Sequence, residues 1–119
     1  MGKFKELVVW KEARELCVRI YAVTDNSSFR RDFGFRDQIR RAAVSVPSNI
    51  AEGDESGFTR LGLRYLNIAK ASLAELETQI EIAALIQYID RSEDEELNEI
   101  IDRLSRKLRK LILYRSKIK

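Results

Sequence analysis

The only proline of this chain, Pro47, lies inside a stretch with the apolar spacing of an α-helix, RRAAVSVPSNIAEG (40–53). A proline in a helix interior cannot donate a hydrogen bond to the carbonyl four residues earlier, here that of Ala43, and its ring clashes with that carbonyl. The short side chains of Ser45 and Asn49 can bond freed backbone groups or a neighbouring helix. Two interpretations stay open: a kink tolerated within a long core helix, or a kink that shapes a subunit contact or a ligand surface.

Apolar residues recur at alternating spacings of three and four over most of the sequence, which is typical of amphipathic helices. Five glycines and one proline in 119 residues leave little material for the turns of a β-protein. The short linkers place consecutive helices next to one another as antiparallel neighbours. We therefore predict an all-α chain that forms one domain over 1–119, an antiparallel up-down four-helix bundle with its second helix kinked at Pro47. The predicted helices span about 7–24, 32–53, 58–89 and 93–115.

Two predicted helix ends depend on specific residues. Gly53 suits the left-handed position that follows the last turn of the second helix. Ser92 and Glu95 have the spacing of a capping box, in which each side chain bonds the other residue's backbone N–H at the start of a helix. We expect the second helix to end at Gly53 and the fourth to begin beside Ser92.

The second predicted helix carries a polar row beside its core face. Small and polar side chains at this spacing predict the close approach of another helix, from the same chain or from another subunit. The row consists of Gln38, Ala42, Ser45, Asn49 and Glu52.

The third predicted helix has two apolar or small faces. One face, with Leu66, Leu73 and Ile80, keeps the spacing of a core-facing helix. A surface helix of a monomer normally carries charge on the opposite side, so a second face of this kind predicts self-association. The candidate oligomer contacts are Asn67, Ala71, Ala74 and Thr78, with Ile82 and Leu85 beyond them.

Basic residues outnumber acidic ones only slightly, with a net charge of +3, but they are unevenly distributed. Contacts between basic side chains and phosphates are tolerant of sequence and weaken strongly with salt. The sequence shows no aromatic residues interleaved with these cations in the way that stacks single-stranded bases. The alternative for the cations of the second helix is a solvated helix surface. The candidate nucleic-acid contacts are Arg36, Arg40, Arg41, Arg106, Lys107, Arg109, Lys110, Arg115 and Lys117.

An acidic band from Glu75 to Asp102 favours a different partner. Such a surface repels nucleic acid on its side and suits the docking of a partner protein. The sequence thus leaves two function classes open, a nucleic-acid-associated factor that binds RNA or DNA and a protein-interaction module.

The residue types exclude many catalytic sites. Without histidine, a Ser-His-Asp or Cys-His nucleophile cannot form, and one cysteine cannot build a thiolate zinc site within the chain. The glycines are too scattered to cradle a phosphate. We expect no enzymatic activity, no cofactor, no metal and no small-molecule substrate. Cys17 falls on the apolar stripe of the first helix, where we expect a small buried residue rather than a reactive thiol.

The chain lacks the features of an export signal or a membrane anchor. Its first residues do not contain the apolar run of a signal peptide, and no apolar run approaches the roughly 20 residues that span a bilayer. A single cysteine is compatible with a reducing compartment. We expect a cytoplasmic protein without membrane contact.

Three segments in this order resemble the bacterial four-helix bundle protein family, the 23S ribosomal RNA intervening-sequence proteins, which are related to the accessory proteins of diversity-generating retroelements. They are LVVWKEA (7–13), QIRRAAVSVPSNIAEG (38–53) and YLNIAKASLAELETQIEIA (65–83). The motif of the second segment includes Pro47, Asn49, Glu52 and Gly53.

The resemblance implies an antiparallel four-helix fold, commonly a homopentamer, with suspected nucleic-acid association. One segment departs from the family. Many relatives carry basic or aromatic residues after this motif, whereas Asp54, Glu55, Ser56 and Gly57 follow it here.

Overall fold

The structure, a computed structural model, describes residues 3–118, and within this range the chain is all-α, without any β-strand. This confirms the all-α part of the predicted fold class. The elements are a 3-10 turn η1 (Phe4–Glu6) and the helices α1 (Val8–Val23), α2 (Ser27–Arg31), α3 (Phe33–Glu55), α4 (Arg60–Leu85) and α5 (Arg91–Ile118).

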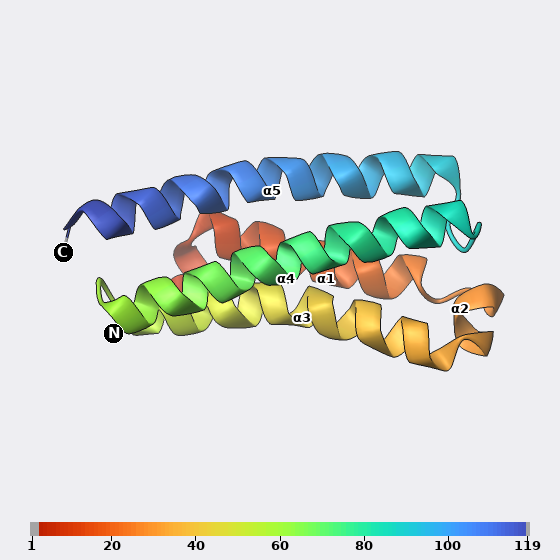
Figure 1. Cartoon of the computed structure of the whole chain (residues 1–119), viewed down its shortest axis with the longest axis horizontal. Helices are drawn as coiled ribbons and strands as arrows, with labels where there is room; N and C mark the ends of the chain where they lie inside the picture. The colour runs from red at the N-terminus through yellow and green to blue at the C-terminus, as the bar shows by residue number, and fades with distance from the viewer. Residues whose placement is uncertain (1–2, 119) are drawn as a thin grey trace.

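The four long helices lie side by side in a rod of 47 × 22 × 20 Å (Figure 1). In Figure 1 the colour runs in opposite directions along successive long helices, so each is antiparallel to the one before it. α3 and α5 each pack against both α1 and α4. Within the described range the backbone of α3 does not come close to that of α5, nor that of α1 to that of α4, so these pairs lie diagonally across the bundle. One long side chain, Arg115 of α5, still reaches Asp54 at the end of α3.

The apolar stripes of the four long helices meet along the axis of the rod. On α4 the side chains of Leu66, Leu73 and Ile80 are fully or almost fully buried, as their spacing predicts. Burial of aliphatic side chains on this scale, worth about 1.5–3 kcal/mol each, holds the helices together. The other large side chains of the core include Leu16, Ile20, Ile39, Ile50, Leu76, Leu97, Ile101 and Leu104.

A short helix, α2, lies between α1 and α3, where the sequence predicted only a break. Asn26 caps it, because its side-chain oxygen accepts a hydrogen bond from the Phe29 N–H at 2.9 Å. Phe29 is fully buried and packs against Phe35 and Tyr88, with ring centroids 5.7 and 5.1 Å away. α2 therefore closes one end of the core with an aromatic cluster.

The prediction that Gly53 ends its helix is wrong. Gly53 lies inside α3, which continues to Glu55, and it is buried where α3 meets α4. Gly57 takes the left-handed conformation instead, with φ of 69°, and its N–H donates to the Asp54 carbonyl at 3.1 Å. Glycine is needed at the two positions for different reasons. Gly53 allows close packing of α3 against α4, and Gly57 adopts a positive φ.

The third predicted helix is shorter than expected and the capping box of the last helix is misplaced. α4 ends at Leu85, and Gln87 adopts φ of 64°. The Asp90 N–H donates to the Glu93 carboxylate at 2.9 Å, and the Glu93 N–H donates to the Asp90 carboxylate at 2.8 Å. This reciprocal pair is a capping box two residues before the one predicted at Ser92 and Glu95.

Pro47 lies within α3, which is assigned as one continuous helix. The polar residues beside it act as the sequence suggested. The Asn49 side-chain amide donates to the Ser45 carbonyl at 2.8 Å, and the Ser45 hydroxyl lies 2.8 Å from the hydroxyl of Ser72 on α4. The polar row of α3 therefore faces α4 of the same chain.

Candidate self-association and nucleic-acid surfaces

The row predicted for self-association lies on the outward face of α4. All six of its side chains are exposed, and among the large apolar ones Ile82 is 43% and Leu85 73% exposed. Two further apolar side chains of the same helix, Leu61 and Ile68, are 53% and 38% exposed. The part of the chain that the structure describes leaves this face uncovered. The predicted residues are Asn67, Ala71, Ala74, Thr78, Ile82 and Leu85.

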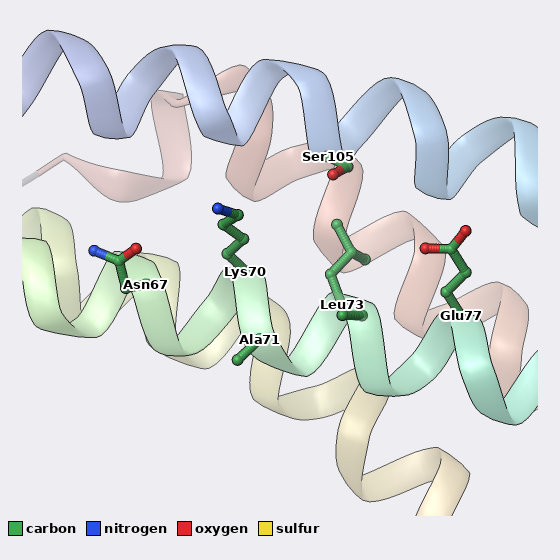
Figure 2. A pocket seen from close by; sticks show the side chains of 7 residues that line it. Asn67, Lys70, Ala71, Leu73, Glu77 and Ser105 are labelled. Carbon is green, nitrogen blue, oxygen red and sulfur yellow. The ribbon is translucent and has the colours of Figure 1, made fainter.

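A shallow hollow of about 300 Å³ borders this face where α4 meets α5 (Figure 2). Figure 2 shows Lys70 and Glu77 pointing from α4 toward α5, while Ala71 points away from α5. The residues that line the hollow are Asn67, Lys70, Ala71, Leu73, Ala74, Glu77 and Ser105. α4 thus presents a narrow central ridge of small residues with charges along one side.

The three arginines predicted on α3 differ in how free they are. Arg40 is held by its own chain, because its guanidinium donates to the Thr24 hydroxyl at 2.9 Å and to the Tyr21 carbonyl at 3.2 Å and covers the Tyr21 ring. The guanidinium of Arg36 lies over the Phe33 ring, 5.4 Å from its centroid. Arg41 is exposed and makes only a long ion pair of 3.8 Å with Asp37. Of the three predicted arginines on α3, Arg41 is therefore the most available to a ligand.

Two predicted cations of α5 are paired with acids. Lys107 donates to the Glu12 carboxylate of α1 at 2.6 Å. Arg106 forms an ion pair with Asp102, one turn earlier on α5. Partly exposed pairs of this kind contribute little to stability, but they reduce the net positive charge that a phosphate meets.

Arg115 is buried rather than exposed. Its side chain is 8% exposed and forms an ion pair of 2.6 Å with Asp54, whose side chain is 11% exposed. Its guanidinium also lies 4.7 Å from the centroid of the Phe58 ring. Arg115 therefore ties the end of α5 to the end of α3 and is not presented to a ligand.

Arg109, Lys110 and Lys117 are exposed, and no acid of the described residues lies within ion-pair distance of them. They belong to the second half of α5. Because α3 and α5 are diagonal, the arginines of α3 do not join them, and the nine predicted cations do not form one surface.

An exposed aromatic pair, missed in the sequence, lies beside these cations. Tyr114 is 58% exposed and Phe58 44%, and their rings meet edge to face with centroids 6.0 Å apart. The position of Tyr114 between Lys110 and Lys117 in the sequence could have indicated an aromatic ring beside these cations. Phe58 could not be found in this way, since it reaches α5 only through the packing of the turn before α4.

The family model for the 23S rRNA-intervening sequence protein matches residues 5–110 of this sequence. The chain belongs to this family. A solved structure of a protein of unknown function from the S23 ribosomal protein family of Bacteroides thetaiotaomicron is similar, with a TM-score of 0.78 and 29% sequence identity. The similarity covers 88% of this chain and 98% of that one. No curated protein matches this sequence.

In this member of the 23S rRNA-intervening sequence protein family, the acidic turn after the shared motif has an internal partner. Asp54, the first residue after the motif, lies in the last turn of α3 and is paired with Arg115, as described above. The negative charge of Asp54 is therefore balanced within the chain rather than directed at a ligand.

Cys17 is half-buried in a groove between α1 and α3 that Pro47 also lines, and burial raises the pKa of its thiol. A raised pKa disfavours the thiolate, which is the reactive form. Among residues 3–118 no group of three or more acidic or cysteine side chains could hold a metal ion. Within the same range, no helix combines the length and the apolar character needed to cross a bilayer.

Proposed function

We propose that this family member is a non-enzymatic, homo-oligomeric protein that binds RNA or DNA through the second half of α5 and acts in the cytoplasm. Its building unit is the antiparallel up-down four-helix bundle, with α3 bent at Pro47. The proposal includes no cofactor and no catalytic step, in keeping with a sequence that has no histidine.

The observation that carries the proposal is the set of unpaired cations on α5 beside exposed aromatic rings. Arg109, Lys110 and Lys117 can each approach a phosphate without first breaking an ion pair within the described chain. Tyr114 and Phe58 add ring surface on which an unpaired base can stack. Cations and rings together are the combination typical of proteins that bind single-stranded nucleic acid.

Self-association would strengthen a site that is weak in one chain. When several copies of a site are tethered together, the second contact forms at a high effective concentration. The exposed apolar side chains of α4, Ile82 and Leu85 among them, support association. The resemblance noted in the sequence implies five copies, and the solution mass tests that number.

The test compares two triple variants with the same loss of charge. The first is Arg109→Gln with Lys110→Gln and Lys117→Gln. The control is Arg14→Gln with Arg30→Gln and Arg91→Gln, whose cations are exposed but paired with acids. Fluorescence anisotropy with labelled single-stranded RNA, double-stranded RNA and single-stranded DNA is measured at low and moderate salt.

We expect the first variant to bind at least about tenfold more weakly than the control at low salt. The salt dependence should also fall, because each lost phosphate contact lowers the slope of log K against log salt by about 0.7 for a single strand. Equal binding by the two variants would remove α5 from the proposal. The three probes distinguish RNA from DNA and single from double strands.

The alternative is a scaffold that docks a partner protein, such as an enzyme acting on nucleic acid. The acidic stretch between Glu75 and Asp102 supports it, since exposed acids there would attract a basic protein surface. No binding of the unaltered protein to any of the three probes would favour this alternative.

A further inference from the structure

Exposed cations form a straight row along the outer side of α5, in its second half. This α5 row consists of Arg103, Arg106, Lys110 and Lys117. Successive members are three, four and seven residues apart. At about 100° per residue, the row therefore falls within about 60° of the helix surface. The backbone of α5 comes close only to those of α1 and α4, and α5 runs along one long edge of the rod (Figure 1), so the described chain leaves the row uncovered.

An aromatic side chain fills the one gap in the α5 row. Tyr114 lies four residues after Lys110 and three before Lys117, and its side chain is exposed. The edge-to-face contact with Phe58, with centroids 6.0 Å apart, supports the ring from the turn before α4. Each turn of this part of α5 thus presents either a cation or a ring on its outer side.

Neither the helix dipole nor ion pairing explains the α5 row. The dipole favours cations only in the last turn of a helix, whereas Arg103 and Arg106 lie in the middle of α5. Among the described residues no acid lies within ion-pair distance of Arg103. Arg106 is paired with Asp102, but both side chains are more than half exposed, so a phosphate can replace the carboxylate at little cost.

We propose that a single strand of RNA or DNA lies along α5, with its phosphates on the α5 row and one base stacked on Tyr114. This inference rests on the proposed function and specifies the form and the path of the nucleic acid. It also adds Arg103 to the binding residues. The helix rises about 21 Å over about four turns between Arg103 and Lys117, so one nucleotide on each turn gives a site of about five nucleotides.

The central position of the α5 row favours a single strand over a double helix. An α-helix in the major groove of DNA has a phosphate backbone on each side, which calls for cations on both of its flanks. On the flank toward α1, Lys107 is paired with Glu12. The flank toward α4 carries Arg109, one turn after Ser105 of the hollow between the two helices. The unpaired charge is therefore concentrated in one line, which suits one backbone.

An acid marks one end of the proposed path. Glu99 lies on the same side of α5, four residues before Arg103, and it is exposed. Its carboxylate would repel a phosphate. The chain has no acid after Asp102. The strand should therefore extend from Arg103 toward the end of α5 and not toward its start.

The experiment removes one charge of each sign from the path. Arg103→Gln removes a proposed contact, and Arg31→Gln on α2 is its matched control. Glu99→Gln removes the acid that limits the path, and Glu52→Gln on α3 is its matched control. Both control residues are exposed and form no ion pair with a described residue. Fluorescence anisotropy follows labelled single strands of RNA and DNA of about five and ten nucleotides, and duplexes of the longer sequences, at two salt concentrations.

We expect Arg103→Gln to bind single strands about three- to tenfold more weakly at low salt, with the slope of log K against log salt reduced by about 0.7. Glu99→Gln should bind about threefold more tightly or better, because a repulsion is removed. Both controls should match the unaltered protein, and the shorter strand should saturate at one per chain.

Two results would overturn this path and leave the proposed function standing. One is that Arg103→Gln and Glu99→Gln behave like their controls although the triple variant of Arg109, Lys110 and Lys117 loses binding. The other is tighter binding of duplexes than of single strands. An unaltered protein that binds none of the probes would instead overturn the proposed function, and this inference with it.

Discussion

Gly53 of α3 and Gly62 of α4 pack backbone to backbone. A Cβ added at Gly53 would lie 3.1 Å from the Gly62 carbonyl oxygen, and one added at Gly62 would lie 3.0 Å from the Gly53 carbonyl oxygen. Side chains other than hydrogen therefore do not fit between the two helices at this point. The crossing explains why the shared motif ends in a glycine that does not terminate its helix.

We predict that Gly62→Ala destabilises the fold by at least about 1–3 kcal/mol, since its Cβ would also lie 2.4 Å from the Gly57 carbonyl oxygen and the backbone must move. Urea unfolding followed by circular dichroism measures the free energy. Gly34→Ala is the control, because nothing lies within 4 Å of its added Cβ and alanine favours a helix. Gly34→Ala should be neutral or should stabilise the fold by up to about 1 kcal/mol. An equal loss of unfolding free energy in both variants would contradict close packing at Gly62.

We predict that Arg115→Leu lowers the free energy of unfolding by about 3 kcal/mol or more, because it leaves the Asp54 carboxylate largely buried without its partner. Adding Asp54→Asn should recover part of this loss, since the unpaired charge is then removed. Urea titrations of the two single variants and the double variant measure the coupling. A double variant with the summed loss of the two singles would show that the pair is not coupled.

The periodic part of the fold could be predicted, because a helix that buries one side must repeat its apolar residues. Leu66, Leu73 and Ile80 follow that rule over several turns and are buried accordingly. Five residues are too few to show a period, so α2 was missed, although Asn26 is a favourable cap and Phe29 is apolar. Helix ends were misplaced because Gln87, without a glycine's freedom, adopts the positive φ that follows α4.

The outward face of α4 could be predicted for the same reason as the core, since exposure on a helix follows its period. The sequence did not allow us to predict which cations are free of ion pairs. Lys107 is paired with Glu12, and Arg115 with Asp54, across large separations in sequence. Only the fold brings these acids close, because α5 packs against α1 and the Arg115 side chain reaches the end of α3. A list of basic residues therefore overstated the available positive charge.

We predict that an ion pair between α1 and α5 makes stability depend on pH in the acidic range. The hydrogen bond from Arg19 lowers the pKa of Glu96 below its ordinary value of 4.5. A lowered pKa in the folded state adds stability that is present above pH 4.5 and is lost as the pH falls through the folded-state pKa. Arg19→Gln should therefore be less stable than the unaltered protein at pH 7, by less than about 1 kcal/mol for this exposed pair.

Below the folded-state pKa, the stability difference between Arg19→Gln and the unaltered protein should disappear, because Glu96 is protonated in both. Urea unfolding at pH values from 7 down to 3 measures it. Arg91→Gln serves for comparison, since its partner Glu95 lies on the same helix and shares no contact between helices. A difference that persists at low pH would assign the effect of Arg19 to packing rather than to charge.

We predict that Tyr114→Ala weakens the binding of single-stranded nucleic acid by about five- to tenfold, the lower part of the range for loss of one stacked base. Tyr114→Phe keeps the ring and should bind normally, which separates stacking from any role of the hydroxyl. Because neither variant removes a cation, the salt dependence should match that of the unaltered protein. Double-stranded probes, whose bases are already stacked on one another, should be affected less.

Phe33→Ala is the control for Tyr114→Ala, because it removes an exposed aromatic ring from α3, away from α5. Anisotropy titrations with one single-stranded and one double-stranded probe at two salt concentrations suffice. Equal weakening by both alanine variants would mean that exposed rings act through general adhesion. An effect of Tyr114→Ala on both probes alike would mean that the ring contributes to the shape of the phosphate-binding surface rather than stacking on bases.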